Sequence, residues 1–95
     1  MSLLRHIVLF PIRDDVPDQQ VADALQVLRG LGAMDGVREW RVELSRDSRK
    51  GRIVVENGLI AEESFEAFRA SPEHQDAGRV LSAIAEVWLI GDYRE

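Results

Sequence analysis

The chain contains no cysteine among its 95 residues. This absence excludes a disulfide framework, a thiol nucleophile and a thiolate metal site. Lysine is scarce too, and the twelve basic residues, eleven of them arginine, are scattered among seventeen acidic ones. A nucleic-acid partner needs a concentrated basic face, which this distribution and the net charge of −5 do not provide. We therefore predict no nucleic-acid binding.

Long apolar runs are also missing. The longest is far too short to cross a bilayer, and the N-terminus has no basic stretch followed by a long apolar region and a small-residue cleavage site. We predict a cytoplasmic protein with no membrane partner. No glycine-rich phosphate loop follows an expected strand, and no serine stands in a nucleophile-elbow context. Phosphate-transfer and hydrolase functions therefore receive little support.

What is present has the balance of a globular protein. Hydrophobic residues make up 45% of the chain and charged residues 31%, with no segment that has a disordered or low-complexity composition. We predict one domain over residues 1–95, large enough for a single core. A chain of this length leaves much of its surface exposed, so a partner surface would be an advantage.

The periodicity of apolar residues predicts four strands and two helical regions. The expected strands cover residues 3–12, 37–44, 52–60 and 86–93, and the helical regions begin near Pro17 and Glu62. The polar segment 45–51 ends in glycine and is typical of a hairpin loop. The order βαββαβ predicts an α+β, ferredoxin-like fold, in which an antiparallel four-stranded sheet carries helices on one face.

The second face of that sheet needs a cover, because the first and last expected strands are apolar on both sides. The same face of a second copy is the natural cover, and we predict a homodimer that forms through the sheet faces. The alternative is a monomer whose twisted sheet folds its second face over itself.

A break in the second helical region is the most informative local feature. A helical pattern that carries Phe65 and Phe68 is interrupted at Ser71-Pro72, because Pro72 disfavours a helical conformation at the residue before it. Ser71 is a good N-cap, and a proline at the first helical position loses no hydrogen bond. A new helix should therefore begin here, with His74 in its first turn.

His74 shares helical spacing with Ala77, Leu81 and Ile84, so its imidazole should point inward. The helix dipole and partial burial both disfavour the protonated form, and we expect the side chain to be neutral near pH 7. Two interpretations stay open. His74 is either a general base in an apolar pocket or a core histidine whose nitrogens bond to neighbouring backbone.

Four segments carry a family resemblance: His6-Ile-Val-Leu-Phe10, Gly36-Val37, Phe65-Glu-Ala-Phe-Arg-Ala-Ser-Pro-Glu-His74 and Gly91-Asp92-Tyr93. Together they make the chain similar, nearly end to end, to the stress-responsive dimeric α/β-barrel (Dabb) domain family. The family pattern at the helix break is an aromatic residue, two further residues and His-Pro-x-His. Phe68, Pro72 and His74 match this pattern, whereas Ser71 replaces its first histidine.

The resemblance implies a ferredoxin-like fold that pairs through its sheets into a dimeric α/β barrel, with a cavity between sheet and helices in each subunit. Most family members have no assigned reaction. A few plant members are polyketide cyclases, in which the histidine corresponding to His74 acts as base and a tyrosine at the position of Phe68 helps to hold the substrate. Phe68 has no hydroxyl group, so chemistry of that kind loses one polar partner here.

His6 lies near the cavity by the same resemblance, so both histidines could face one pocket, with His74 as base and His6 as orienter or hydrogen-bond donor. Alternatively, His6 bonds across to the helix layer and fixes its packing. Two imidazoles on separate elements form no ligand-spacing motif, and the sequence places no carboxylate to complete a tetrahedral set. We predict no metal and no cofactor.

The sequence thus predicts a stress-responsive Dabb-type protein that binds a small apolar or carbonyl-containing molecule near His74, with Phe65, Phe68 and His6 as ligand contacts. The alternative is a cofactor-free enzyme that uses His74 as general base for aldol-type cyclisation or isomerisation of a polyketide-like substrate. A monooxygenase of the wider dimeric α/β-barrel type resembles this chain in fold only.

Overall fold

The computed structural model describes residues 2–46 and 49–95. In chain order, its elements are β1 (Leu3–Pro11), α1 (Asp18–Arg29), the 3-10 turn η1 (Gly30–Ala33), β2 (Val37–Leu44), β3 (Ile53–Ala61), the 3-10 turn η2 (Glu62–Ser64), α2 (Phe65–Ala70), α3 (Pro72–Ser82) and β4 (Leu89–Arg94). The expected βαββαβ order is confirmed. The expected loop 45–51 contains residues 47 and 48, which lie outside the described residues.

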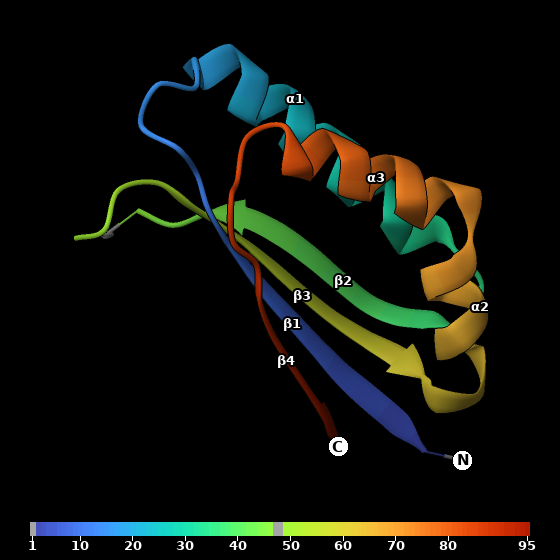
Figure 1. Cartoon of the computed structure of the whole chain (residues 1–95). Helices are drawn as coiled ribbons and strands as arrows, with labels where there is room; N and C mark the ends of the chain where they lie inside the picture. The colour runs from blue at the N-terminus through green and yellow to red at the C-terminus, as the bar shows by residue number, and fades with distance from the viewer. Residues whose placement is uncertain (1, 47–48) are drawn as a thin grey trace.

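The four strands form one antiparallel sheet in the order β2-β3-β1-β4. Figure 1 shows α1 and α3 side by side over one face of this sheet, while no helix of the described chain covers the other face. β3 and β1 are the central strands of the sheet, and β2 and β4 are its edge strands. The fold is therefore the ferredoxin-like plan expected from the sequence.

Side-chain alternation along β1 divides the sheet into a helix-covered face and an open face. His6, Val8 and Phe10 are buried beneath the helices, whereas Arg5 and Ile7 on the opposite side are only half-buried. The helices supply the other half of the core through apolar stripes that include Val21, Ala24 and Leu28 on α1 and Ala77 and Leu81 on α3. Burial of these apolar side chains is the main favourable term that holds the layers together.

The helix break forms as the sequence predicts. Ser71 has an extended backbone (φ −65°, ψ 150°), and its hydroxyl oxygen accepts a hydrogen bond of 3.1 Å from the backbone N–H of His74. The same hydroxyl donates to the carbonyl oxygen of Phe68 at 2.8 Å, which joins the end of α2 to the start of α3. Pro72 occupies the first turn of α3, where the missing N–H costs nothing.

Several element boundaries differ from those expected. β1 ends at Pro11 instead of residue 12, β3 covers Ile53–Ala61 instead of 52–60, and β4 ends at Arg94 instead of residue 93. The last strand begins at Leu89 instead of residue 86, because Ala85 makes only an isolated bridge with Ile12 and Trp88 packs its ring edge-on against Phe10, with centroids 5.4 Å apart. The first turn of the second helical region is a 3-10 turn, η2, that precedes α2. Across the described residues, every helix is too short or too polar to span a bilayer.

Candidate functional site

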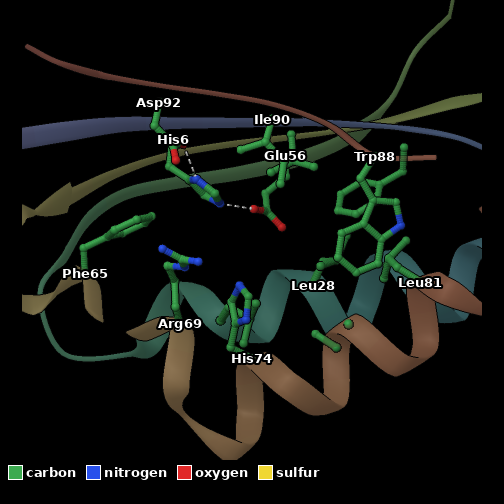
Figure 2. A pocket seen from close by; sticks show the side chains of 15 residues that line it. His6, Leu28, Glu56, Phe65, Arg69, His74, Leu81, Trp88, Ile90 and Asp92 are labelled. Carbon is green, nitrogen blue, oxygen red and sulfur yellow. Dashed lines mark hydrogen bonds and ion pairs between the residues drawn. The ribbon is translucent and has the colours of Figure 1, made fainter. Parts of the chain in front are cut away.

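A cavity of about 290 Å³ lies between the sheet and the helix layer. Most of its wall is apolar, with contributions from Val8, Phe10, Leu28, Leu81, Trp88 and Ile90. Its polar groups are His6, Glu56, Arg69, His74 and Asp92. Figure 2 shows His6, Glu56 and Asp92 on the strand side, and Arg69 and His74 on the helix side, with their side chains directed toward one another.

His6 lies between two carboxylates. In the strand pairing it stands opposite Asp92 of β4, and Glu56 of β3 is its diagonal neighbour on the same face of the sheet. Its Nδ1 is 2.6 Å from Asp92 Oδ1 and its Nε2 is 2.9 Å from Glu56 Oε2. The second contact is an ion pair by distance, although its angle falls outside hydrogen-bond geometry.

Burial alone would lower the pKa of His6, which is only 5% exposed. The close carboxylates of Glu56 and Asp92 outweigh that burial, and the pKa of His6 is raised above its usual value. Both ring nitrogens of His6 lie against its own carboxylates, at 2.6 Å and 2.9 Å. Neither nitrogen is directed at a ligand, so the direct effect of His6 is to fix the positions of Glu56 and Asp92.

His74 has the opposite electrostatic character. The side chain is half-buried, and its ring packs edge-on against Phe68 with centroids 5.0 Å apart. Burial is the main cause that lowers the pKa of His74, with further lowering by the positive charges of His6 and Arg69 and partial opposition from Glu56. The direction agrees with the sequence expectation, and the neutral imidazole offers one donor and one acceptor nitrogen.

The structure brings most of the predicted site residues together. His6, Phe65 and His74 line the cavity. Phe68 is not among the lining residues, because its ring is 2% exposed and packs behind the two imidazoles, 6.4 Å from His6 by ring centroids. The roles of these residues as base, orienter and ligand contacts stay predictions.

Three polar residues of the cavity were not predicted: Glu56, Arg69 and Asp92. The sequence analysis considered carboxylates only as ligands that could complete a metal site, and it missed the two that flank His6. A usable signal existed for Glu56, since it occupies the same face of its strand as the buried Val54. Arg69 lies over the Phe65 ring, with its guanidinium carbon 5.6 Å from the ring centroid, a contact that helical spacing of four residues permits.

Metal binding has no geometric support in the part of the chain that the structure describes. No group of three or more histidine and carboxylate side chains there is arranged to hold an ion. The two carboxylates beside His6 contact opposite nitrogens of one ring, so their oxygens and the ring do not converge on a common point. Of the two tryptophans, Trp88 lines the cavity, while the indole N–H of Trp40 donates to the carbonyl oxygen of Leu28 at 2.9 Å.

Several solved structures share this fold. A dimeric ferredoxin-like protein of unknown function from Thermobifida fusca is 21% identical, with a TM-score of 0.84 over 99% of this chain and 92% of that one. A Dabb family protein from Mesorhizobium loti is 18% identical, with a TM-score of 0.80 over 98% and 96% of the two chains. The hydroxynitrile lyase of Passiflora edulis is 16% identical, with a TM-score of 0.83 over 99% and 94%. No curated protein matches the chain.

The sequence also matches a protein family over nearly its whole length. That family is described as the Stress responsive A/B Barrel Domain, and the match covers residues 4–95. Apart from Leu3 at the start of β1, the match contains the four strands, the three helices and every polar residue of the cavity as the structure describes them. The resemblance noted in the sequence is thereby confirmed, and this chain belongs to the Dabb family of stress-responsive A/B barrel domains.

Proposed function

We propose that this chain binds a small, mostly apolar molecule with a carbonyl group in the cavity beside His74, and that it does so as a homodimer. The observation that carries this proposal is the uncharged, half-buried imidazole of His74 at the wall of an apolar hollow of about 290 Å³. Ligand sites of this kind are mostly apolar, with a few polar groups that fix orientation.

The polar groups on the helix side suit a carbonyl oxygen. Arg69 presents a guanidinium, which donates only, and a neutral His74 has one N–H to donate. The apolar remainder of the ligand would lie against Leu28, Leu81 and Trp88. Because no charged group lies on that part of the wall, a strongly charged ligand would lose its hydration there without compensation.

Calorimetry with acetophenone and ethylbenzene tests this proposal, because the two differ in the carbonyl group and little in size. We expect the wild-type protein to bind acetophenone at least about fivefold more tightly, a preference worth the gain of one hydrogen bond. His74→Leu should reduce this preference, whereas Gln75→Leu, at an exposed position on the same helix, should not. If neither probe binds the wild-type protein, the proposal is wrong.

A second candidate function is cofactor-free catalysis with His74 as general base. The lowered pKa of His74 favours it, because the free nitrogen lone pair is available near neutral pH. The imidazole would take a proton from the carbon beside a carbonyl group. The C–H electron pair then forms a C=C bond, and the π pair of the carbonyl group moves onto its oxygen to give an enolate, beside the Arg69 guanidinium. That enolate would serve aldol-type cyclisation or isomerisation. One protein of similar fold is a hydroxynitrile lyase, so catalysis is compatible with this architecture.

Exchange of the methyl hydrogens of acetophenone for deuterium in heavy water reports this proton transfer directly. We expect the wild-type protein to accelerate the exchange and His74→Leu to lower the acceleration about 100-fold, the usual contribution of a positioned base. If binding occurs and exchange stays at the buffer rate, the chain is a binding protein without this chemistry.

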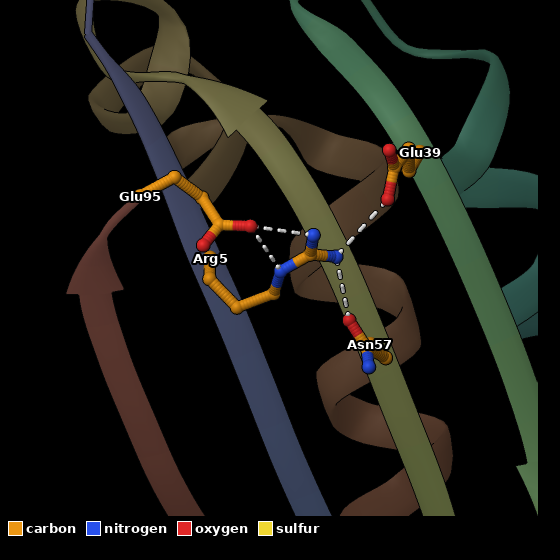
Figure 3. Close-up of polar contacts among 4 residues, drawn as sticks. All are labelled: Arg5, Glu39, Asn57 and Glu95. Carbon is orange, nitrogen blue, oxygen red and sulfur yellow. Dashed lines mark hydrogen bonds and ion pairs between the residues drawn. The ribbon is translucent and has the colours of Figure 1, made fainter.

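The homodimer is supported by the open face of the sheet. Leu89 and Tyr93 of β4 are 55% and 53% exposed there, beside the half-buried apolar side chains of β1. Arg5 and Arg41 are cations on this face; Arg41 pairs with Glu43, and Figure 3 shows the Arg5 guanidinium bonded within its own chain to Glu39, Asn57 and Glu95. A cation satisfied in this way can enter an interface without being left unpaired. The Thermobifida fusca relative is described as dimeric.

A further inference from the structure

Glu56 is a buried carboxylate with unused hydrogen-bonding capacity. Its side chain is 4% exposed and belongs to the inner face of β3, where its strand neighbours on that face are Val54 and Gly58. In the described part of the chain, its ionic partner is His6 Nε2 at 2.9 Å. An ionised carboxylate has about four lone-pair sites, and this single contact occupies one of them.

The remaining lone pairs face the cavity. Glu56 is one of the lining residues, and Figure 2 shows its carboxylate extending from the sheet toward the helix side, away from the strand that carries it. His6 cannot satisfy a second oxygen, because its other nitrogen is engaged by Asp92 at 2.6 Å. A buried acceptor of this kind gains most from a ligand that brings a hydrogen-bond donor.

The opposite wall carries the complementary groups. Arg69 and His74 come from the two sides of the Ser71-Pro72 break, and both line the cavity. Arg69 only donates, so it cannot satisfy an N–H or O–H of the ligand, whereas Glu56 only accepts. The polar end of the cavity therefore offers an acceptor on the sheet side and donors on the helix side.

We propose that Glu56 is the residue that selects the ligand, and that the cavity takes hydroxy-carbonyl compounds, whose hydroxyl group donates to Glu56 while the carbonyl oxygen accepts from Arg69 or His74. The inference rests on the proposed carbonyl-binding function and specifies its ligand class. Asp92 and His6 are positioning residues, because Asp92 fixes the His6 ring and His6 in turn holds the Glu56 carboxylate in place. Apolar ligands with a carbonyl group alone leave Glu56 without a donor.

Three acetophenones separate these possibilities when their affinities are measured by calorimetry. All three have the carbonyl group. α-Hydroxyacetophenone adds a hydroxyl group, α-methoxyacetophenone has an ether oxygen there and no donor, and acetophenone has neither the second oxygen nor the donor. We expect the wild-type protein to prefer the hydroxy compound to the methoxy compound by about tenfold, as a charge-assisted hydrogen bond would provide. Glu56→Gln should abolish most of this preference, whereas Glu63→Gln, at an exposed site, should keep it.

Affinity for acetophenone serves as the measure of an intact cavity in each variant. If Glu56→Gln does not fold, Glu56→Asp replaces it; this variant keeps the charge and withdraws the carboxylate by one methylene, and should also lose the preference. Equal binding of all three probes by the wild-type protein would overturn the role of Glu56 and leave carbonyl binding standing. Binding of none of them would overturn the carbonyl-binding proposal itself.

Discussion

His6 and Asp92 stand directly opposite each other in the pairing of β1 with β4, and their side chains meet at 2.6 Å on the inner face of the sheet. This contact joins the side chains of the edge strand β4 and the central strand β1. All six residues of β4 are exposed, so apolar burial contributes little to holding that strand. The pair therefore has both a structural role and an electrostatic one, since Asp92 is one of the two groups that raise the pKa of His6.

Asp92→Asn should reduce stability most at low pH. The pKa of His6 is raised in the folded chain, so its stabilising contribution is fully present below the unfolded value of about 6.5 and is lost as pH rises through the folded value. The amide removes one of the two causes of that shift. We expect a loss of about 1–2 kcal/mol in the free energy of unfolding at pH 6, discounted because Asp92 is partly exposed, and a smaller loss at pH 8.

Urea denaturation of the wild-type and Asp92→Asn proteins between pH 5.5 and 8 gives this difference. His74 contributes with the opposite sign, because its lowered pKa makes stability rise with pH below 6.5, but it is present in both proteins and largely cancels. Asp23→Asn, on the exposed side of α1, is the control. Parallel profiles of unfolding free energy against pH for all three proteins would show that the pKa of His6 does not depend on Asp92.

Ser71→Ala should destabilise the chain by about 1 kcal/mol, the usual cost of a lost N-cap. The serine hydroxyl accepts from the His74 N–H and donates to the Phe68 carbonyl, and alanine can do neither. For a domain of this size the melting temperature should fall by about 4–8 °C, measured by circular dichroism. Ser71→Thr, which retains the capping oxygen, should recover most of the loss, and equal melting temperatures for both variants would show that the cap is not responsible.

Two glycines should respond to alanine in opposite directions. Gly78 lies within α3, and a Cβ there would meet Trp88 at an ordinary 3.5 Å, so Gly78→Ala should gain about 0.5–1 kcal/mol from helix propensity. Gly36 has a positive φ of 86°, and a Cβ would come within 2.3 Å of Ser64. Gly36→Ala should cost about 1–3 kcal/mol. Thermal denaturation measures both, and a loss at Gly78 would show that the wall of the cavity beside Trp88 tolerates no added atom.

The elements that the sequence predicted best are those set by local chemistry. The second strand has the expected bounds, Val37–Leu44, because apolar and charged residues alternate along it. The Ser71-Pro72 break was predictable because capping and proline sterics act within a few residues. The inward direction of His74 followed from the spacing of α3 alone.

The carboxylates around His6 could not be predicted in the same way. Asp92 is 86 residues away from His6 in the chain, and its position depends on which strands pair and in which register. Glu56 depends on a second pairing, in which it is a diagonal neighbour of His6. The predicted start of β4 was wrong for a related reason. Residues 86–88 have a strand-like pattern, but Trp88 packs against Phe10 and these residues do not join the sheet.

The proposed dimer predicts that a charge on the open face will produce monomers. Ile7 lies at the middle of β1 on that face, between Asn57 of β3 and Gly91 of β4, so a partner's apolar side chains would have to pack around it. Ile7→Glu would place a carboxylate on a face whose nearby cations are already paired, Arg5 with Glu39 and Glu95 and Arg41 with Glu43. Removing apolar surface and adding an unpaired charge should together weaken association by several kcal/mol.

Sedimentation at micromolar concentration measures the outcome as a mass. We expect two chains for the wild-type protein and one for Ile7→Glu. Val27→Glu is the control, because Val27 is also an aliphatic residue that reaches the surface, 40% exposed, but belongs to α1 on the helix side of the molecule. Both glutamates add the same charge to the same chain, so dissociation in the first variant alone would assign the interface to the sheet face. A wild-type mass of one chain would show that the apolar residues of β1 and β4 tolerate water without a partner.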